Sequence, residues 1–228
     1  QSLLIRIGSR LKSQERASVN PEAGDRWLHW AREIQALAKT GLHYARNEFE
    51  VERAEKLIEI AAEIISSYSN LSMDQLNFAF EQQPGYVTPK VDVRGAVFKE
   101  DKLLMVQEVM DGGWTLPGGW ADVGEAPALA TEREVLEEAG LEVKAVRLVG
   151  VYDANRVPGS LDLFHAYKLI FLCKLTGGQI ETSHETSDVG FYSRNEIPEP
   201  LSGYRTTEKH LEDIFRAHVD GNVPAVFD

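Results

Sequence analysis

Three glutamates near the middle of the chain have a spacing that suits metal chemistry. Glu134, Glu137 and Glu138 stand at positions i, i+3 and i+4, so a helix would carry all three on one face. Like charges packed in this way repel one another, and a surface helix gains nothing from them. Because hard divalent cations prefer oxygen ligands, a bound dication would resolve the conflict. We interpret the cluster as a candidate metal site, with a solvated acidic face as the plain alternative.

A glycine-rich loop precedes these glutamates and favours the metal interpretation. The run from Trp114 to Pro117 is typical of a strand entering a turn, and Gly118 and Gly119 follow it directly. Glycines let backbone carbonyls approach a ligand without obstruction by a side chain. A merely solvated acidic face does not require such glycines.

The elements that must position this site fall into two parts. Residues 1–84 are expected to form a small, wholly helical domain, because apolar residues recur at steps of three and four over residues 26–39, 47–67 and 72–80. Capping signals stand at Asn47 and Ser72, and Gly41 is expected to end the first helix. The helical period stops around Pro84, where we place the domain boundary.

Residues 85–228 are expected to form a second, larger α+β domain. Period-two patterns predict strands at residues 91–98, 103–106, 143–152, 164–175 and 189–192. The glutamate helix follows the glycine-rich loop, and Thr206 or Thr207 is expected to open a last helix that ends at Gly221. Strands interrupted by single helices predict a mixed sheet covered by helices on both faces.

The charge distribution argues against nucleic acid as a partner. The net charge is −12, and residues 85–228 carry 14 Lys and Arg against 24 Asp and Glu. Binding to a polyanion through a basic surface needs the opposite balance, so phosphates would have to be bound through metal. No apolar run is long enough to span a bilayer. The chain has one cysteine, Cys173, and therefore no disulfide framework. Because proteins without disulfides are typical of reducing compartments, we expect a cytoplasmic protein.

The central stretch resembles the Nudix box at each of its defined positions, which are Gly119, Glu125, Arg133, Glu134, Glu137, Glu138, Gly140 and Leu141. The resemblance implies a Nudix α/β/α sandwich with a mixed sheet. It also implies hydrolysis of the pyrophosphate bond of a nucleoside diphosphate linked to another group, with Mg²⁺ or Mn²⁺. Metals that bridge pyrophosphate oxygens cancel charge and acidify a bound water, which is the chemistry such a bond needs.

Roles for individual residues follow from the same resemblance. Glu134 and Glu138 are expected as the main metal ligands, Glu137 as a further ligand or an outer acceptor, and the carbonyl of Gly119 as a backbone ligand. Arg133 is expected to orient the carboxylates of the helix by bidentate hydrogen bonding, with Glu125 as its partner.

The general base and the phosphate contacts stay open at this point. Members of the family keep the base in the box or in a later loop, and Glu185 is our preferred loop candidate against a plain solvated turn. Arg94 is expected either to reach a substrate phosphate or to form a structural ion pair with Asp92 or a carboxylate of the box.

The helical N-terminal part narrows the resemblance to a Nudix subgroup best known for CDP-choline pyrophosphatase activity, whose members are homodimers. CDP-choline hydrolysis to CMP and phosphocholine is therefore the first expectation. ADP-ribose is the second, because Pro158 stands one residue from where ADP-ribose pyrophosphatases carry a proline. Choline would need aromatic faces, for which we consider the side chains of Trp114, Trp120, Tyr152 and Phe164.

A hypothesis from another class is a ligand sensor that no longer cleaves. Such a protein need not keep the carboxylates of the box, whereas this chain keeps all of them. The enzyme interpretation is therefore preferred.

Overall fold

The computed structural model describes residues 26–156, 163–203 and 205–228. The chain divides into two compact units between Pro89 and Lys90, and the segment that ends at His165 belongs with the first unit. The domain boundary expected after residue 84 stays a prediction. In the part of the chain that is described, no helix is long and apolar enough to cross a membrane.

The first unit is helical, as the apolar periodicity predicts. Its helices are α1 (Arg26–Tyr44), α2 (Glu48–Tyr68) and α3 (Met73–Glu81), with Asn47 and Ser72 as the N-caps of the second and third. Their core includes Leu28, Ala31, Ile65, Leu76 and Phe80, and Leu163 packs into the same cluster.

The end predicted for the first helix is wrong. The helix continues through Gly41 to Tyr44. Gly41 is not among the glycines with positive φ, so it does not form the left-handed turn by which glycine ends a helix. A glycine inside a helix lowers its stability but does not by itself stop it.

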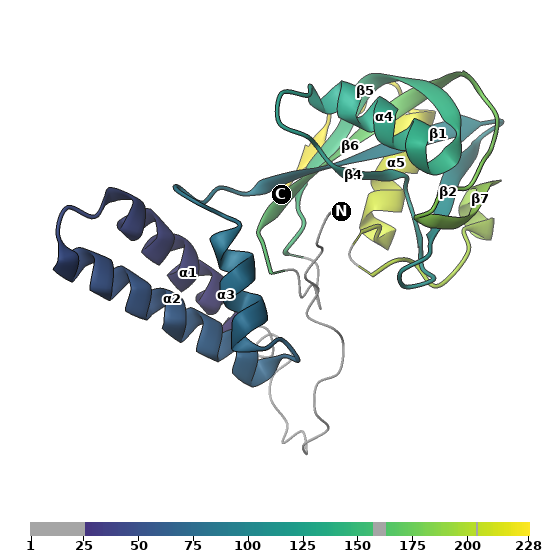
Figure 1. Ribbon diagram of the computed structural model, residues 1–228. Helices are drawn as coiled ribbons and strands as arrows, with labels where there is room; N and C mark the ends of the chain where they lie inside the picture. The colour runs from purple at the N-terminus through teal and green to yellow at the C-terminus, as the bar shows by residue number, and fades with distance from the viewer. Residues whose placement is uncertain (1–25, 157–162, 204) are drawn as a thin grey trace. The chain divides into compact units, whose positions relative to one another are not determined.

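The second unit contains a mixed sheet, as predicted (Figure 1). Its strands are β1 (Lys90–Lys99), β2 (Lys102–Glu108), β3 (Trp114–Thr115), β4 (Gly118–Trp120), β5 (Leu141–Asp153), β6 (Ala166–Gly178), β7 (Thr186–Tyr192) and β8 (Val226–Phe227). The order is β3-β2-β1-β6-β5-β8, with β4 paired to β1 and β7 paired to β2. Strand β1 runs parallel to β6 and antiparallel to β2 and β4, which makes β1 the centre of the sheet.

Two helices cover opposite faces of this sheet (Figure 1). Helix α4 (Pro127–Ala139) packs through Val135 and Ala139 against a cluster that includes Val97 and Cys173. Helix α5 (Glu208–Val219) packs through Leu211 and Ile214 against residues on the other face of the strands. The two clusters follow from the alternation of side chains along β1 and β2, which the sequence pattern predicts.

His210 takes part in the N-terminal cap of α5. Thr207 accepts a hydrogen bond from the His210 backbone N–H, and the His210 ring accepts one from the Thr207 backbone N–H at Nδ1. The side chain is buried. Burial, followed by the charges of Lys168, Arg94 and Lys209, lowers the pKa of His210 to about 3. The ring is therefore neutral in the folded protein.

This arrangement predicts a loss of stability in mild acid. The unfolded chain binds a proton at His210 near pH 6.5 and the folded chain near pH 3. The contribution of neutral His210 to the unfolding free energy is therefore fully present above pH 6.5 and is lost as the pH decreases. Between pH 7.5 and 5.5 the wild type should lose about 1.4 kcal/mol more unfolding free energy than His210→Gln. Urea unfolding of both proteins at the two pH values measures this, and equal losses would contradict it.

Candidate active site

Helix α4 presents the carboxylates of the box along one side. Pro127 occupies its first turn, where no backbone donor is needed, and Gly140 ends it in the left-handed conformation at φ 69°. The Glu138 side chain is buried and that of Glu134 is nearly so, whereas the Glu137 side chain is 57% exposed. The three glutamates thus share a side of the helix but differ strongly in their contact with water.

Arg133 holds three carboxylates at once. Its guanidinium donates to both oxygens of Glu125, at 3.0 and 2.9 Å, which is the bidentate contact expected from the sequence. Nη1 also donates to Glu134 at 2.9 Å and to Glu137 at 3.1 Å. The hydrogen bond with Glu125 is the main reason that the pKa of Arg133 is raised, and the same contact lowers the pKa of Glu125.

Glu138 is a carboxylate that the fold has taken out of water. One of its oxygens accepts the backbone N–H of Gly118 at 2.9 Å. Burial raises the pKa of Glu138 to about 7, although the nearby charge of Arg94 and the hydrogen bond from Gly118 act in the opposite direction. Burial also raises the pKa of Glu134. Such carboxylates favour the charged state only when a cation lies close to them.

The backbone of β4 lies against these carboxylates because its first two residues are glycines. A Cβ atom on Gly119 would stand 2.9 Å from an oxygen of Glu134. Gly118 has φ 147°, and a Cβ there would stand 2.0 Å from the carbonyl oxygen of Val93. The backbone at Gly119 therefore lies directly against the Glu134 carboxylate, and carboxylate and peptide oxygens are ligands that suit a hard divalent cation.

Two of the three helix carboxylates, those of Glu134 and Glu137, are held in this structure by Arg133. No group of three His, Cys, Asp or Glu side chains within the described residues is already arranged to hold a metal. Glu134 and Glu137 each direct an oxygen to the Arg133 guanidinium.

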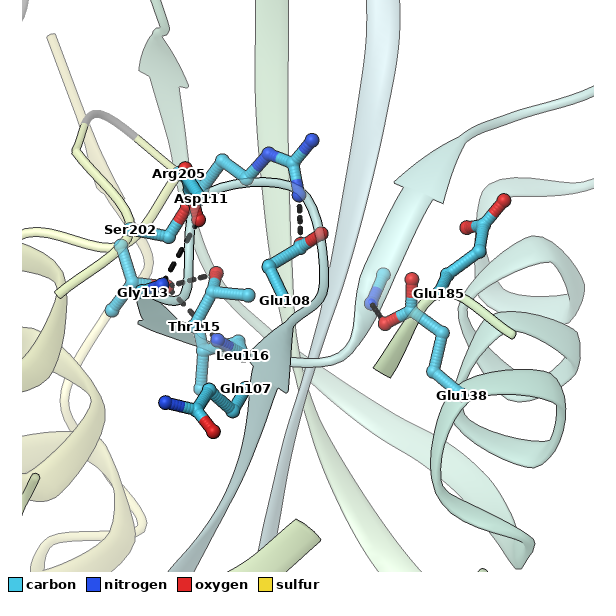
Figure 2. A network of polar contacts seen from close by, with 12 residues as sticks. Gln107, Glu108, Asp111, Gly113, Thr115, Leu116, Glu138, Glu185, Ser202 and Arg205 are labelled. Carbon is cyan, nitrogen blue, oxygen red and sulfur yellow. Dashed lines mark hydrogen bonds and ion pairs between the residues drawn. The ribbon is translucent and has the colours of Figure 1, made fainter. Parts of the chain in front are cut away.

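Glu185 lies close to Glu138, as Figure 2 shows. The loop that carries it is fixed at two points: the Glu185 carbonyl accepts the N–H of Val109, and the Thr186 hydroxyl donates to the Glu138 carbonyl, each at 2.9 Å. The Glu185 side chain is 61% exposed, so water reaches it. Its charge contributes to the raised pKa of Glu138.

The other predicted site residues have mixed environments. Arg94 is buried, pairs with Asp92 at 3.0 Å and donates to the carbonyl of Leu116 at 3.1 Å. Trp120 is half-buried on β4. Trp114 is 6% exposed and packs in the core, 5.3 Å from the ring of Tyr192, so its environment is that of a packing residue. Pro158 lies outside the described residues.

Sequence reasoning missed several buried polar residues near the site. Glu108 and Arg205 form an ion pair in the network of Figure 2, and Lys168 lies 3.5 Å from Asp92. Glu108 and Arg205 are far apart in the sequence, so no local pattern joins them. For Lys168 a signal existed, because this cation directly precedes the apolar run from Leu169 to Cys173 in a predicted strand.

Comparisons with known proteins agree with the two-part organisation. Residues 25–80 match the family described as "UDP-X-like, N-terminal oligomerisation domain", and residues 88–213 match the NUDIX domain. The second match covers more than half of the chain.

Individual relatives cover most of the chain. YjhB of Bacillus subtilis, provisionally named an ADP-ribose pyrophosphatase, is 36% identical over 190 residues, which are 83% of this chain and 91% of that protein. The crystal structure of an ADP-ribose pyrophosphatase from Streptococcus suis has 39% identity and a TM-score of 0.56, and the match covers 62% of this chain and 100% of the other. A UDP-X diphosphatase structure has 28% identity and a TM-score of 0.58, with 90% and 99% covered. The chain is therefore an enzyme of the Nudix hydrolase family, with a helical domain of the UDP-X-like type before the catalytic domain.

Proposed function

We propose that this enzyme hydrolyses the diphosphate bond of a nucleoside diphosphate linked to another group, with the sugar conjugate ADP-ribose as the first candidate substrate and CDP-choline as the second. The observation that carries the proposal is the pair of desolvated carboxylates, Glu134 and Glu138, gathered against the glycine backbone of β4. Buried carboxylates arranged in this way need a cation, and a diphosphate needs one as well.

In this proposal Glu134, Glu138 and the carbonyl of Gly119 hold Mg²⁺ or Mn²⁺, which neutralises phosphate charge and acidifies a water when bound. Arg133 keeps the helix carboxylates oriented through its bidentate contact with Glu125. Glu137 is the most exposed of the three glutamates and serves as an outer ligand or acceptor.

Glu185 is the proposed general base. Its carboxylate is open to water and lies near Glu138, which supports a role in taking the proton of an attacking water. The alternative base is a carboxylate of the box. Arg94 is proposed to bind a phosphate oxygen, because its charge lies close to Glu134 and Glu138 while Asp92 holds its Nε.

The aromatic residues favour a sugar conjugate over CDP-choline. Tyr152 is buried and donates its hydroxyl to Asp213, and Trp114 packs in the sheet core. Phe164 packs with the helical unit. Of the four aromatic candidates, Trp120 alone belongs to the strand of Gly119, whereas a quaternary ammonium is usually bound by several aromatic faces. The names of the relatives, two ADP-ribose pyrophosphatases and a UDP-X diphosphatase, also favour a sugar conjugate over CDP-choline.

A panel of substrates tests this order. With Mg²⁺, ADP-ribose should give AMP and ribose 5-phosphate at a higher kcat/KM than CDP-choline gives CMP and phosphocholine, with a UDP-sugar as a third arm. Products resolved by chromatography provide the measurement. Cleavage of CDP-choline alone would reverse the order, and the absence of product from all three would contradict the proposed reaction.

Glu138→Gln should lower kcat on the order of 10²-fold with little effect on folding, because it removes a charge that the cation requires. Steady-state kinetics and thermal unfolding measure the two effects. The matched control is Glu132→Gln on the same helix, since Glu132 contacts Lys144 and the backbone of Ala145 instead of the site. Equal activity of the two variants would contradict the role of Glu138.

Arg133→Lys keeps the charge but cannot make the bidentate contact with Glu125. We expect Mn²⁺ affinity and kcat to fall by about 10- to 100-fold, as happens when residues that orient metal ligands are replaced. Mn²⁺ binding followed by electron paramagnetic resonance gives a measurement that does not depend on turnover. Unchanged Mn²⁺ affinity would show that Arg133 does not orient the ligands.

The helical domain is proposed to form a homodimer. Trp30, Leu37 and Tyr44 stand seven residues apart on α1, so they share one face, and they are 54%, 67% and 64% exposed. The opposite face of α1 carries the buried residues Leu28, Ala31, Gln35 and Ala38. An exposed apolar row on a domain of an oligomerisation family is suited to bury itself against a second copy.

Leu37→Glu should therefore shift the protein from dimer to monomer in light scattering coupled to size-exclusion chromatography. The charge would be buried without a partner in the dimer but stays in water in the monomer. His29→Glu is the control, because it adds the same charge on a different face of α1. A Leu37→Glu dimer as stable as the wild type would contradict the proposed interface.

A further inference from the structure

Segment 179–186, which carries the proposed base, is bonded to the last turn of α4. A helix leaves its last carbonyls without partners inside the helix. Here backbone N–H groups of the segment donate to the carbonyls of Ala139 and Gly140, each at 3.1 Å. The Thr186 hydroxyl donates to the carbonyl of Glu138 at 2.9 Å. The segment with the proposed base is therefore fixed to the helix with the proposed metal ligands.

Two hydroxyl groups connect the backbone of Glu185 to the backbone of Glu138. The Glu185 N–H donates to Oγ of Ser183 at 3.1 Å, and this oxygen lies 3.2 Å from Oγ1 of Thr186. The Thr186 hydroxyl proton goes to the Glu138 carbonyl. Because a hydroxyl has a single proton, the Ser183 hydroxyl then donates to Thr186. The result is a hydrogen-bond chain that runs in one direction, from the Glu185 N–H to the Glu138 carbonyl.

Thr186 is the buried member of this hydrogen-bond chain. It is 2% exposed, and its hydroxyl also accepts the N–H of Ser183 at 2.9 Å. Thr186 is the register partner of Glu108 at the end of β2. The residue after Glu108, Val109, donates its N–H to the Glu185 carbonyl at 2.9 Å. Thr186 thus lies where the end of α4, the end of β2 and the start of β7 meet.

The side chain of Glu185 is largely in water, beside that of Glu138 in Figure 2. Its carboxylate lies 3.4 Å from the ring of His184, which is 89% exposed. A contact between two exposed charged groups does little to hold a side chain in one place. The position of the Glu185 carboxylate relative to Glu138 therefore depends on the backbone of its loop, which Thr186 fastens to α4.

We propose that Thr186 is a positioning residue for the hydrolysis, because its hydroxyl sets the position of the proposed base, Glu185, relative to the proposed metal ligand, Glu138. The inference rests on the proposed function, in which the base takes a proton from an attacking water. An error of about 1 Å in the placement of a reacting group can lower a rate on the order of 10²-fold. Thr186 acts through Glu185, so its loss should change kcat more than binding.

Thr186→Val removes the hydroxyl and keeps the shape of the side chain. For the conjugate that the enzyme cleaves, kcat should fall about 10- to 100-fold. KM and the Mn²⁺ affinity measured by electron paramagnetic resonance should change by less than about twofold. Thr186→Ser keeps the hydroxyl and should restore most of kcat. An unchanged kcat in Thr186→Val, or a loss of Mn²⁺ affinity as large as the loss of kcat, would overturn the proposal.

Thr131→Val is the matched control. Thr131 is also buried, and its hydroxyl donates to a carbonyl of α4, but to that of Pro127 in the first turn of the helix. This variant should keep kcat, and thermal unfolding compares its stability with that of Thr186→Val. A fall in kcat as large as that of Thr186→Val would show a general effect of losing a buried hydroxyl and would overturn the proposal.

A double-mutant cycle with Glu185→Gln separates positioning from a general effect on stability. If Thr186 acts through Glu185, Thr186→Val should lower kcat far less when Glu185→Gln is already present. Equal falls in the two backgrounds would overturn the role of Thr186 and leave the proposed base intact. An unchanged kcat in Glu185→Gln would contradict the proposed base, and the role of Thr186 with it.

Hydrogen exchange of the full chain in EDTA gives a measurement that does not depend on turnover. The amides of segment 179–186 should exchange faster in Thr186→Val than in the wild type, and those of residues 127–131 should not, because the lost hydrogen bond fastens only the segment. Ser183→Ala repeats the test at a half-buried side chain, removes the acceptor of the Glu185 N–H, and should change exchange and kcat in the same direction. Unaltered exchange of the segment in both variants would overturn the proposal.

Discussion

The candidate active site depends on keeping the Glu138 carboxylate out of water. The fold does this by closing β4 over the C-terminal part of α4, so that the N–H of Gly118 meets one carboxylate oxygen. Burial disfavours the charged form of Glu138, and the nearby charge of Arg94 offsets only part of that cost. Glycine is needed at position 118 because a side chain there would collide with the backbone of Val93, and a side chain at position 119 would push against the Glu134 carboxylate. The proposed requirement for a cation and the need for glycine at position 118 both follow from the close approach of β4 to α4.

Most of this site could be predicted from the sequence because its parts are local. The carboxylates, Arg133, Glu125 and Gly119 lie within a short stretch, and helical periodicity fixes which of them share a face. The order of strands and helices follows from alternation and capping signals in the same way. The residues that escaped prediction depend on long-range contacts. Whether Trp114 packs or binds is decided by Tyr192, which is far away in the sequence.

Two sets of charges meet at the centre of the sheet. The carboxylates of α4 lie on one side of the β1–β4 pair, and the cations Arg94 and Lys168 belong to β1 and β6. Arg94 connects the two sets of charges. Asp92 and the Leu116 carbonyl hold its guanidinium by hydrogen bonds. Its positive charge lowers the pKa values of Glu134 and Glu138, against the larger effect of burial. A diphosphate suits such a place, since it can accept a metal on one part and hydrogen-bond donors on another.

The most direct measurement of the central claim is a crystal structure with Mn²⁺ and its anomalous scattering. We expect a peak coordinated by Glu134, Glu138 and the carbonyl of Gly119, with the contact from Arg133 to Glu134 broken and the contact to Glu125 kept. A peak at other residues, or a Glu134 that stays bound to Arg133 with Mn²⁺ present, would contradict it.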